Sequence, residues 1–226
     1  MEVDGYWSRI PAAEDRIHRT PAGYIGVYVR MLEYGLRFPV HPFVINVLNG
    51  FNISLSQLTP LSIRRTMSYL WVCLFLGFTP DMDVFRTMFK LTPTAQAKSQ
   101  GPGWWNIQDA PGFLSSFPFK SSDKDWRGQW IWVKVPSRSD HPNFYGAPRW
   151  FVRPDKKMSL LGPPSLGKTE EKQLAWFGRR VSAAAQGGFK SAKWLPWAEV
   201  IFRERFLAVV GLSRRLQGGK KLGWGR

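Results

Sequence analysis

The chain has 226 residues, of which 44% are apolar and twelve are Trp, and this composition provides a real hydrophobic core and excludes global disorder. Its net charge of +16 is unevenly distributed: +2 over residues 1–90, +5 over residues 91–157 and +9 over residues 158–226. A nearly neutral first part followed by a basic last third predicts a folded body with a cationic segment for a polyanion, most simply nucleic acid. The alternative is a basic surface that only keeps the protein soluble.

Cysteine usage and the N-terminus bear on the cellular setting. A single cysteine, Cys73, excludes an intramolecular disulfide framework and a zinc site built from several cysteines. The first ten residues begin with acidic side chains and lack the apolar run of a secretory signal, and no stretch is long and apolar enough to span a bilayer. We expect an intracellular protein, in the nucleus or the cytoplasm with the nucleus favoured, and no membrane partner.

The clearest predicted element is a helix over residues 59–78, where Thr59 can cap the start and Pro60 occupies the first helical position. Gly77 stands where a left-handed C-terminal cap is needed. Apolar residues recur at spacings of three and four, which indicates one buried face: Ile63, Met67, Leu70, Trp71, Leu74 and Phe75. The polar residues of the opposite face should be wetter: Ser62, Arg65 and Ser68.

The remaining patterns are weaker. Residues 1–20 show no period and predict a disordered leader. Helical spacing predicts helices over 24–34 and 42–51 and a short turn over 54–58. A further helix, from Pro80 to about Phe89, should be capped by Thr79 and carry Asp81 and Asp83 in its first turn. A composition break at 92–103 predicts a linker. Beyond it, aromatic and β-branched runs predict strands, at 130–135 and 149–153 and, more weakly, at 104–107 and 117–120.

The predicted fold class is therefore α+β. One domain over residues 21–157 should hold helices over 21–91 and a small antiparallel sheet over 104–154. A basic helical extension over 158–210 follows, with helices over 170–185 and 197–210. Residues 211–226 should form a flexible basic tail, because they contain too little apolar material to fold.

Residues Gly162 to Thr169, GPPSLGKT, satisfy the pattern of a phosphate-binding P-loop. A working P-loop follows a buried strand and opens a helix, and here Asp155, Lys156 and Lys157 leave only four residues for that strand. No aspartate occurs after Asp155 to hold magnesium, and the last 57 residues are too few for a parallel sheet. We therefore interpret the match as accidental and expect no nucleotide cofactor.

Nothing else in the sequence forms a convincing catalytic set. A transposase of the DDE type needs three carboxylates that converge on two metals, but Asp81 and Asp83 are better explained as first-turn helix residues. His18, His41 and His141 are scattered, and a satisfied or exposed histidine explains each better than a metal ligand does. We expect no enzyme, no metal, no cofactor and no small-molecule substrate.

The C-terminal third interleaves basic and aromatic side chains, and this pattern suits nucleic acid because bases stack on rings while cations meet phosphates. For the helical part, burial of the rings in a core is the competing explanation. For the tail, which has no core to join, binding explains the pattern better. The candidate nucleic-acid-binding residues are Arg179, Arg180, Lys190, Lys193, Arg214, Arg215, Lys220, Lys221 and Trp224.

Five short motifs between residues 28 and 157 resemble a plant domain family called putative gypsy-type transposon, or transposase (putative) gypsy type. They are Gly35 to Pro39, His41 to Phe43, Ser56 to Pro60, Asp83 to Arg86, and Lys124 to Val135. The resemblance implies origin from a long-terminal-repeat retroelement, in a gag-like role, with no catalytic residues agreed for the family. A zinc knuckle, which gag-type proteins often use, needs three cysteines, so this chain would bind RNA or DNA without one.

Two functions follow as hypotheses. The first is a retroelement-derived, non-enzymatic protein that binds nucleic acid or assembles with copies of itself. The alternative is a protein–protein interaction domain whose positive charge is incidental.

Overall fold

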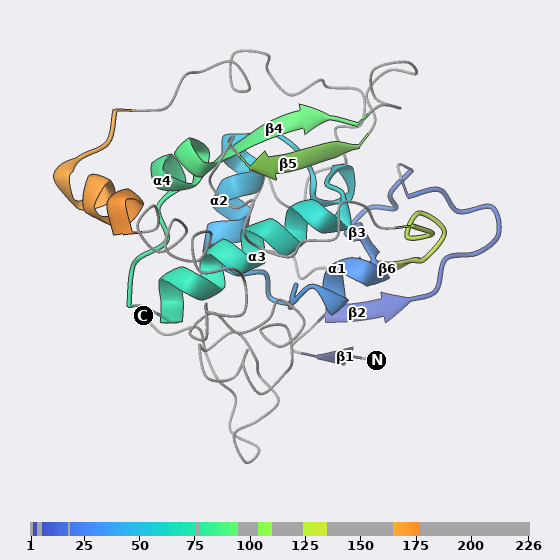
Figure 1. Ribbon diagram of the computed structural model, residues 1–226. Helices are drawn as coiled ribbons and strands as arrows, with labels where there is room; N and C mark the ends of the chain where they lie inside the picture. The colour runs from blue at the N-terminus through green and yellow to red at the C-terminus, as the bar shows by residue number, and fades with distance from the viewer. Residues whose placement is uncertain are drawn as a thin grey trace, which may run out of the picture.

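The computed structural model describes residues 2–3, 6–17, 19–75, 77–94, 104–109, 124–134 and 165–176. In this part of the chain, strands β1–β6 and helices α1, α2 and α4 lie around a central helix, α3 (Figure 1). The strands are β1 (Glu2–Val3), β2 (Tyr6–Arg9), β3 (Tyr24–Tyr28), β4 (Phe89–Pro93), β5 (Trp105–Asp109) and β6 (Trp130–Lys134). The helices are α1 (Val29–Glu33), α2 (Pro42–Gly50), the 3-10 turn η1 (Leu55–Gln57), α3 (Pro60–Phe75) and α4 (Met82–Met88).

Helix α3 confirms the central prediction, with Trp71 only 2% exposed, but its expected wet face is wrong. Ser62 and Ser68 are buried, and Arg65 is half-buried. Strand β5 lies along this side of α3, and the Ser62 hydroxyl accepts a hydrogen bond from the Ile107 N–H at 2.8 Å. Because short hydroxyl side chains can bond to backbone that packs against them, polar residues here mark a buried contact with a strand.

The C-terminus of α3 forms as the sequence predicts. Gly77 has φ +72°, and the Phe78 N–H donates to the Cys73 carbonyl at 2.8 Å. This is a left-handed glycine cap that satisfies carbonyls of the last turn. Phe78 then packs against the core.

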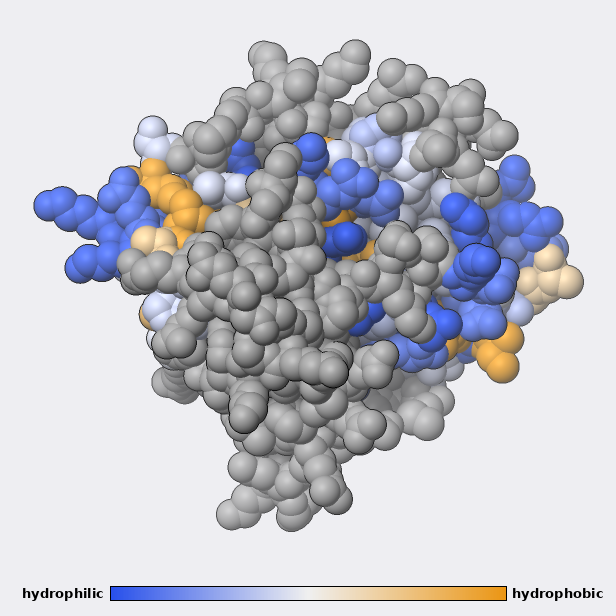
Figure 2. Space-filling model, viewed as in Figure 1, coloured by the Kyte–Doolittle hydropathy of each residue, from blue (hydrophilic) through white to orange (hydrophobic). Residues whose placement is uncertain are grey.

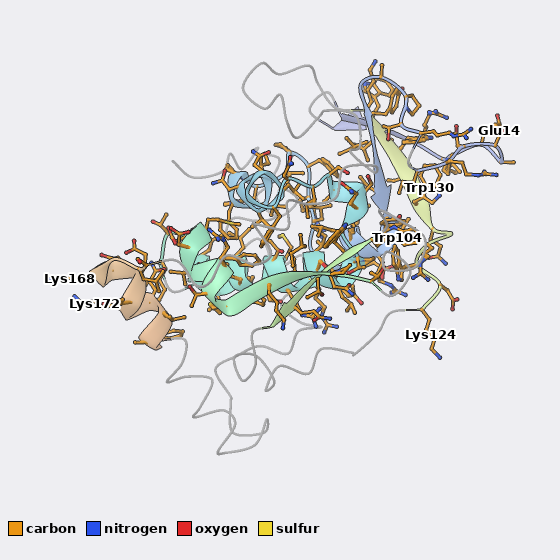
Figure 3. The ribbon with its side chains drawn as sticks, turned by 90° about the horizontal axis from the view of Figure 1, so that it is seen from above. Glu14, Trp104, Lys124, Trp130, Lys168 and Lys172 are labelled. Atoms are coloured by element: carbon orange, nitrogen blue, oxygen red, sulfur yellow. The ribbon has the colours of Figure 1, made fainter. Side chains whose placement is uncertain are left out.

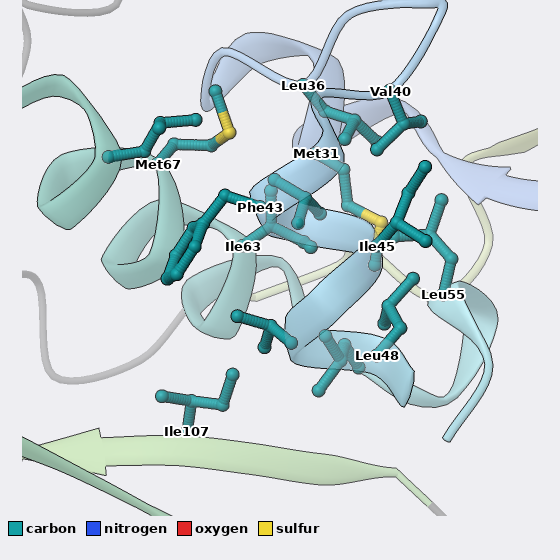
Figure 4. Packing of buried hydrophobic residues seen from close by; sticks show 14 of the residues in the cluster. Met31, Leu36, Val40, Phe43, Ile45, Leu48, Leu55, Ile63, Met67 and Ile107 are labelled. Carbon is teal, nitrogen blue, oxygen red and sulfur yellow. The ribbon is translucent and has the colours of Figure 1, made fainter. Parts of the chain in front are cut away.

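The hydrophobic interior joins α3 to the other helices and to β5. Figure 4 shows Ile63 of α3, Phe43 and Leu48 of α2, and Ile107 of β5 directed into one shared interior. The rings of Phe43, Tyr69 and Phe85 contact one another, with centroids 5.2 to 5.6 Å apart. Phe85 meets each of the other two edge-to-face, and Phe43 and Tyr69 are tilted with respect to each other. This aromatic cluster fastens α2 and α4 onto α3.

The predicted helices before and after α3 are confirmed at α2 and α4, with one change at a cap. The His41 ring nitrogen accepts from the Phe43 N–H at 3.1 Å and caps α2, which Pro42 opens. Helix α4 is capped by Asp81, whose carboxylate accepts from the N–H groups of residues 83 and 84, and not by the Thr79–Pro80 signal. A carboxylate accepts two N–H groups at once, which explains why the cap shifted.

The predicted helix over 24–34 is wrong in its first half. Residues 24–28 form strand β3, and only α1 and the Gly35 stop, with φ +91°, follow the prediction. β3 pairs antiparallel with β6, a partner about a hundred residues away. The aromatic and β-branched residues of this segment fit a strand as well as a helix, and the distant partner decides between the two structures.

The expected disordered leader, 1–20, is also corrected by the structure. β2 pairs antiparallel with β6, and the segment after it returns across the sheet so that Ile17 is buried against Gly26. The leader lacks a period because its order comes from contacts with β3 and β6, and such contacts leave no local pattern.

The two described strands of the small antiparallel sheet expected over 104–154 pair with strands that precede this range in the sequence. The strand predicted at 130–135 exists as β6, in a sheet of order β1-β2-β6-β3, and the one at 104–107 exists as β5, paired with β4. β4 occupies the start of the expected linker. The predicted strands at 117–120 and 149–153 lie outside the described residues, as does the helix at 197–210.

Residues 168–176 are helical and confirm the start of the helix predicted at 170–185. Trp176 stacks edge-on against Phe78 with ring centroids 5.9 Å apart, and Leu174 also packs on the core. This part of the basic extension therefore docks on the body. It does so beside the C-terminal end of α3, on the opposite side of the molecule from β6 (Figure 1).

Candidate nucleic-acid interface

The sequence-predicted binding residues all lie outside the described residues: Arg179, Arg180, Lys190, Lys193, Arg214, Arg215, Lys220, Lys221 and Trp224. The described residues carry fourteen basic and ten acidic side chains, and the other residues carry eighteen and six. The positive excess of the chain is therefore mostly on residues other than the described body. On that body, three arginines lie over aromatic rings: Arg9, Arg64 and Arg127. Arg64, over the Tyr34 ring, is buried, whereas Arg9 and Arg127 form two clusters at the surface.

The first of these clusters lies on the outer face of the β2–β6–β3 sheet. The indole N–H of Trp132 donates to the Asp15 carboxylate at 2.8 Å, and Arg9 pairs with the same carboxylate at 3.3 Å. The Arg9 guanidinium also lies over the rings of Tyr24 and Trp132. Because the Trp132 hydrogen bond and then the other N–H groups favour the ionised form, the pKa of Asp15 falls below its usual value.

Gly26 makes this cluster possible. A Cβ on Gly26 would lie 2.3 Å from Cγ1 of Ile17, so only glycine lets the returning segment reach the sheet. Ile17 and Asp15 then cover the outer face, and Trp132 becomes fully buried. The Arg9 cluster is therefore an internal fastening of the N-terminal segment, with its cation already neutralised.

A second cluster lies at the turn that precedes β6. The guanidinium carbon of Arg127 lies 4.9 Å from the ring centroids of both Trp104 and Trp126. The two indole rings are nearly perpendicular, at 84°, with centroids 5.6 Å apart. The Arg127 head thus sits in the corner between them, where two ring faces attract it.

Tyr28 supports the corner from below. Its hydroxyl accepts the indole N–H of Trp104, at 2.6 Å, and its ring meets Trp126 edge-on at 4.6 Å. Burial raises the pKa of Tyr28 above its usual value, so this phenol stays protonated. The corner is therefore fixed by β3, by the residue that precedes β5, and by the turn before β6.

The P-loop-like segment differs from a phosphate cradle in one respect that the structure describes. Helix 168–176 begins at Lys168, which is exposed, and the Glu170 carboxylate folds back so that Oε2 lies 2.5 Å from where a Cβ of Gly167 would stand. A carboxylate at this N-terminus already meets the positive end of the helix dipole and would repel a phosphate there. Residues 162–164 lie outside the described part.

The remaining titratable candidates are buried within the fold. Burial lowers the pKa of His41 to about 4, which keeps its ring neutral and able to cap α2. Burial also raises the pKa of the Cys73 thiol to about 12, so it is not a nucleophile at neutral pH.

Among the described residues, no three His, Cys, Asp or Glu side chains gather in a way that could hold a metal ion. The described helices include none that is long and apolar enough to cross a membrane.

The helical core of this body is similar to a known family. The model of the family described as "Putative gypsy type transposon" matches residues 26–93. The resemblance is confirmed for this stretch. It covers β3 through β4, and therefore the whole helical core around α3. The motif at 124–135, which forms the Arg127 turn and β6, lies beyond the match, and its resemblance stays a prediction.

A curated relative extends the likeness. The chain is 28% identical over 151 residues to the meiosis-specific protein ASY2 of Arabidopsis thaliana, an alignment that covers 65% of this chain and 10% of that protein. The chain thus spans about a tenth of this relative's length. No solved structure matches the chain.

Sequence reasoning missed both arginine clusters. Arg127, Trp104 and Trp126 are dispersed over 24 residues, and nothing in the sequence indicates that Trp104 returns to the Trp126 turn. A usable signal is present in residues 124–132, KDWRGQWIW, where two cations alternate with three tryptophans. Taken only as a family motif that leads into a strand, this run does not reveal a role for its cations.

Proposed function

We propose that this is a retroelement-derived, non-enzymatic and gag-like protein that binds nucleic acid or assembles with copies of itself. The observation that supports this most directly is the division of charge. The described body is nearly balanced, with fourteen cations and ten anions, whereas the other residues hold eighteen cations and six anions. A balanced body joined to strongly basic segments suits a protein that meets a polyanion through those segments.

The family match and the relative support the proposal. Residues 26–93 match a transposon family, and the relative in Arabidopsis is named as specific to meiosis. We therefore propose a plant protein that acts in the nucleus.

A role without catalysis is supported by how the acidic and nucleophilic groups are used. Asp81 caps α4, Asp15 holds Trp132 and Arg9, and Cys73 is buried. Each of these groups has a structural role that explains its position. A reaction would need such groups free and convergent.

One observation favours the alternative, a protein–protein interaction domain. Trp7 is 49% exposed and Ile10 is 84% exposed, and both lie on or just after β2. On the face shown in Figure 2, the described surface is largely hydrophilic, with small hydrophobic areas. Exposed aromatic and branched side chains of this kind occur in protein interfaces.

Salt dependence separates the two candidates. The full chain is titrated with a duplex DNA and with a single-stranded RNA of about 25 nucleotides at several salt concentrations. If the cations neutralise phosphates, log affinity should fall linearly with log salt, with a slope of about −0.9 per neutralised phosphate on duplex and about −0.7 on single strands. Binding that is absent or insensitive to salt would reject nucleic acid as the partner. Capture of a protein from plant extract that survives both nuclease and high salt would then favour the alternative.

A further inference from the structure

We propose that Arg127 is a phosphate-binding residue on the folded body, held ready by Trp104 and Trp126, and that it gives the body its own contact with the nucleic-acid backbone. This inference rests on the proposed function and adds a defined site to it. None of the nucleic-acid-binding residues predicted from the sequence contributes to this site.

The guanidinium of Arg127 is held in place by its neighbours. An arginine on a protein surface normally loses considerable side-chain freedom when it binds, and that loss weakens binding. Here the guanidinium lies in a corner between two perpendicular indoles, 4.9 Å from each ring centroid. The corner itself is anchored by the hydrogen bond from Trp104 to the buried Tyr28. Much of the ordering is therefore complete before a ligand arrives.

The hydrogen-bond donors of Arg127 remain available to a ligand. Ring faces attract the cation but accept no strong hydrogen bond from its five N–H groups. Within the described chain, the guanidinium has no carboxylate or carbonyl partner, and Arg127 is exposed. Three other described arginines differ, because their heads are already paired: Arg9 with Asp15, Arg30 with Glu33, and Arg86 with Asp83.

The ligand that best fits this guanidinium is a phosphate. A planar guanidinium with free edges matches two oxygens of a phosphate, and such paired charged hydrogen bonds are among the strongest that proteins form. Lys124 is exposed at the start of the same turn and adds a second cation, while the exposed Asp125 between them reduces the local charge. Figure 3 shows Trp104, Lys124 and Trp130 on one side of the molecule, far from Lys168 and Lys172.

A nucleic-acid backbone is favoured over an acidic peptide by the surroundings of the site. The chain carries a net charge of +16, so a long polyanion can meet Arg127 and the basic segments at the same time. Trp104 is partly exposed and offers ring surface next to the phosphate site. A short acidic peptide would gain neither advantage.

The test uses the full chain and three variants. Arg127→Gln removes the charge, Arg127→Lys keeps the charge but removes the planar fork, and Arg19→Gln is the matched control. Arg19 is exposed on the body and has no ring contact or ion pair within the described residues. Each protein is titrated with the same 25-nucleotide duplex and single strand, and its thermal midpoint is measured to show that it is folded.

We expect Arg127→Gln to weaken binding by about tenfold or more, as for removal of a charged hydrogen bond, and to lower the salt slope by about the value of one phosphate. Arg127→Lys should keep the slope but recover only part of the affinity. Arg19→Gln should remain within about threefold of the wild type, because salt screens a charge that makes no direct contact.

The two levels of failure can be distinguished. If the wild type binds and Arg127→Gln matches Arg19→Gln, the site is wrong and the proposed function stands. If the wild type binds neither nucleic acid, both are wrong. If polyglutamate displaces the oligonucleotide from the wild type as well as inorganic polyphosphate does, and only while Arg127 is present, the corner binds acidic peptides and the assignment to nucleic acid is overturned. If Arg127→Gln shows no thermal unfolding transition and is therefore unfolded, Arg127→Lys is the deciding variant. An affinity of Arg127→Lys equal to that of the wild type would then contradict the proposal.

Discussion

The helical core around α3 and the β2–β6–β3 sheet have different origins in the sequence. The core uses a continuous stretch, from Pro42 in α2 to Met88 in α4, so its elements meet close neighbours along the chain. The sheet joins residues 6–9, 24–28 and 130–134, and its partners are separated by about a hundred residues. The helices of the core can therefore be predicted from local sequence patterns. The sheet depends on contacts between distant segments, which no local pattern encodes.

The largest expected effect follows from the core. Trp71→Ala removes a side chain that is 2% exposed at the centre of α3, and it should lower the free energy of unfolding by about 3 kcal/mol or more. Denaturant unfolding measures this. An unchanged midpoint would mean that α3 is not the centre of the core and that the contrast with the sheet is misplaced.

The next effect tests the sheet. Gly26→Ala places a Cβ 2.3 Å from Cγ1 of Ile17, so the N-terminal segment must shift, at a cost of about 1 to 3 kcal/mol. We also expect faster proteolytic cleavage within residues 10–23. Gly128→Ala is the control, because a Cβ there meets no atom within 4 Å. Equal behaviour of the two variants would show that the segment does not depend on this contact.

A smaller effect concerns the acid stability of the core. The folded pKa of His41, about 4, lies below its unfolded value near 6.5, so the unfolded chain binds the extra proton between these pH values. Stability from this group is complete above pH 6.5 and is lost as the pH falls towards 4. His41→Asn keeps a cap acceptor without the titration, so its stability should change less over this window. A parallel pH dependence in both proteins would contradict the assigned role.

The smallest expected effect is at the P-loop-like motif. Lys168→Ala should leave stability and ATP binding unchanged, because Lys168 is exposed and Glu170 already occupies the helix N-terminus. Isothermal titration with ATP measures this. If the wild type binds ATP tightly and the substitution abolishes this binding, the interpretation of the motif as accidental is wrong.

The sequence predicted those elements whose signals are local. Pro60 and Gly77 bound the central helix, and Pro42 opens α2. It failed where a distant partner decides: residues 24–28 have a period that fits helix and strand, and pairing with β6 selects the strand. The sequence pattern also predicted that Ser62 is exposed to solvent, whereas its hydroxyl bonds to β5. A serine that bonds to a packed strand cannot be distinguished by sequence from an exposed serine.

The candidate site divides in the same way. The basic and aromatic residues of the last third are visible as composition, but they lie outside the described residues and stay a prediction. The Arg127 corner is invisible in the sequence, because its two tryptophans come from different segments and become neighbours only when β5 and the Trp126 turn meet at Tyr28. The number of charges can be counted from a sequence, whereas the contacts that hold the Arg127 guanidinium between two indole rings cannot be read from it.

The most direct test of the central claim is a salt titration of nucleic-acid binding by the intact chain and by a chain that lacks residues 212–226. The deletion removes Arg214, Arg215, Lys220, Lys221 and Arg226, five cations with no acidic residue among them. If these cations bind phosphate, the slope of log affinity against log salt should shrink by about 0.7 to 0.9 for each phosphate no longer neutralised, on all sequences alike. Trp224→Ala separates a stacking contribution of about 1 to 3 kcal/mol without a change of charge. Identical slopes for the intact and truncated chains would contradict the account and would favour the interaction-domain alternative.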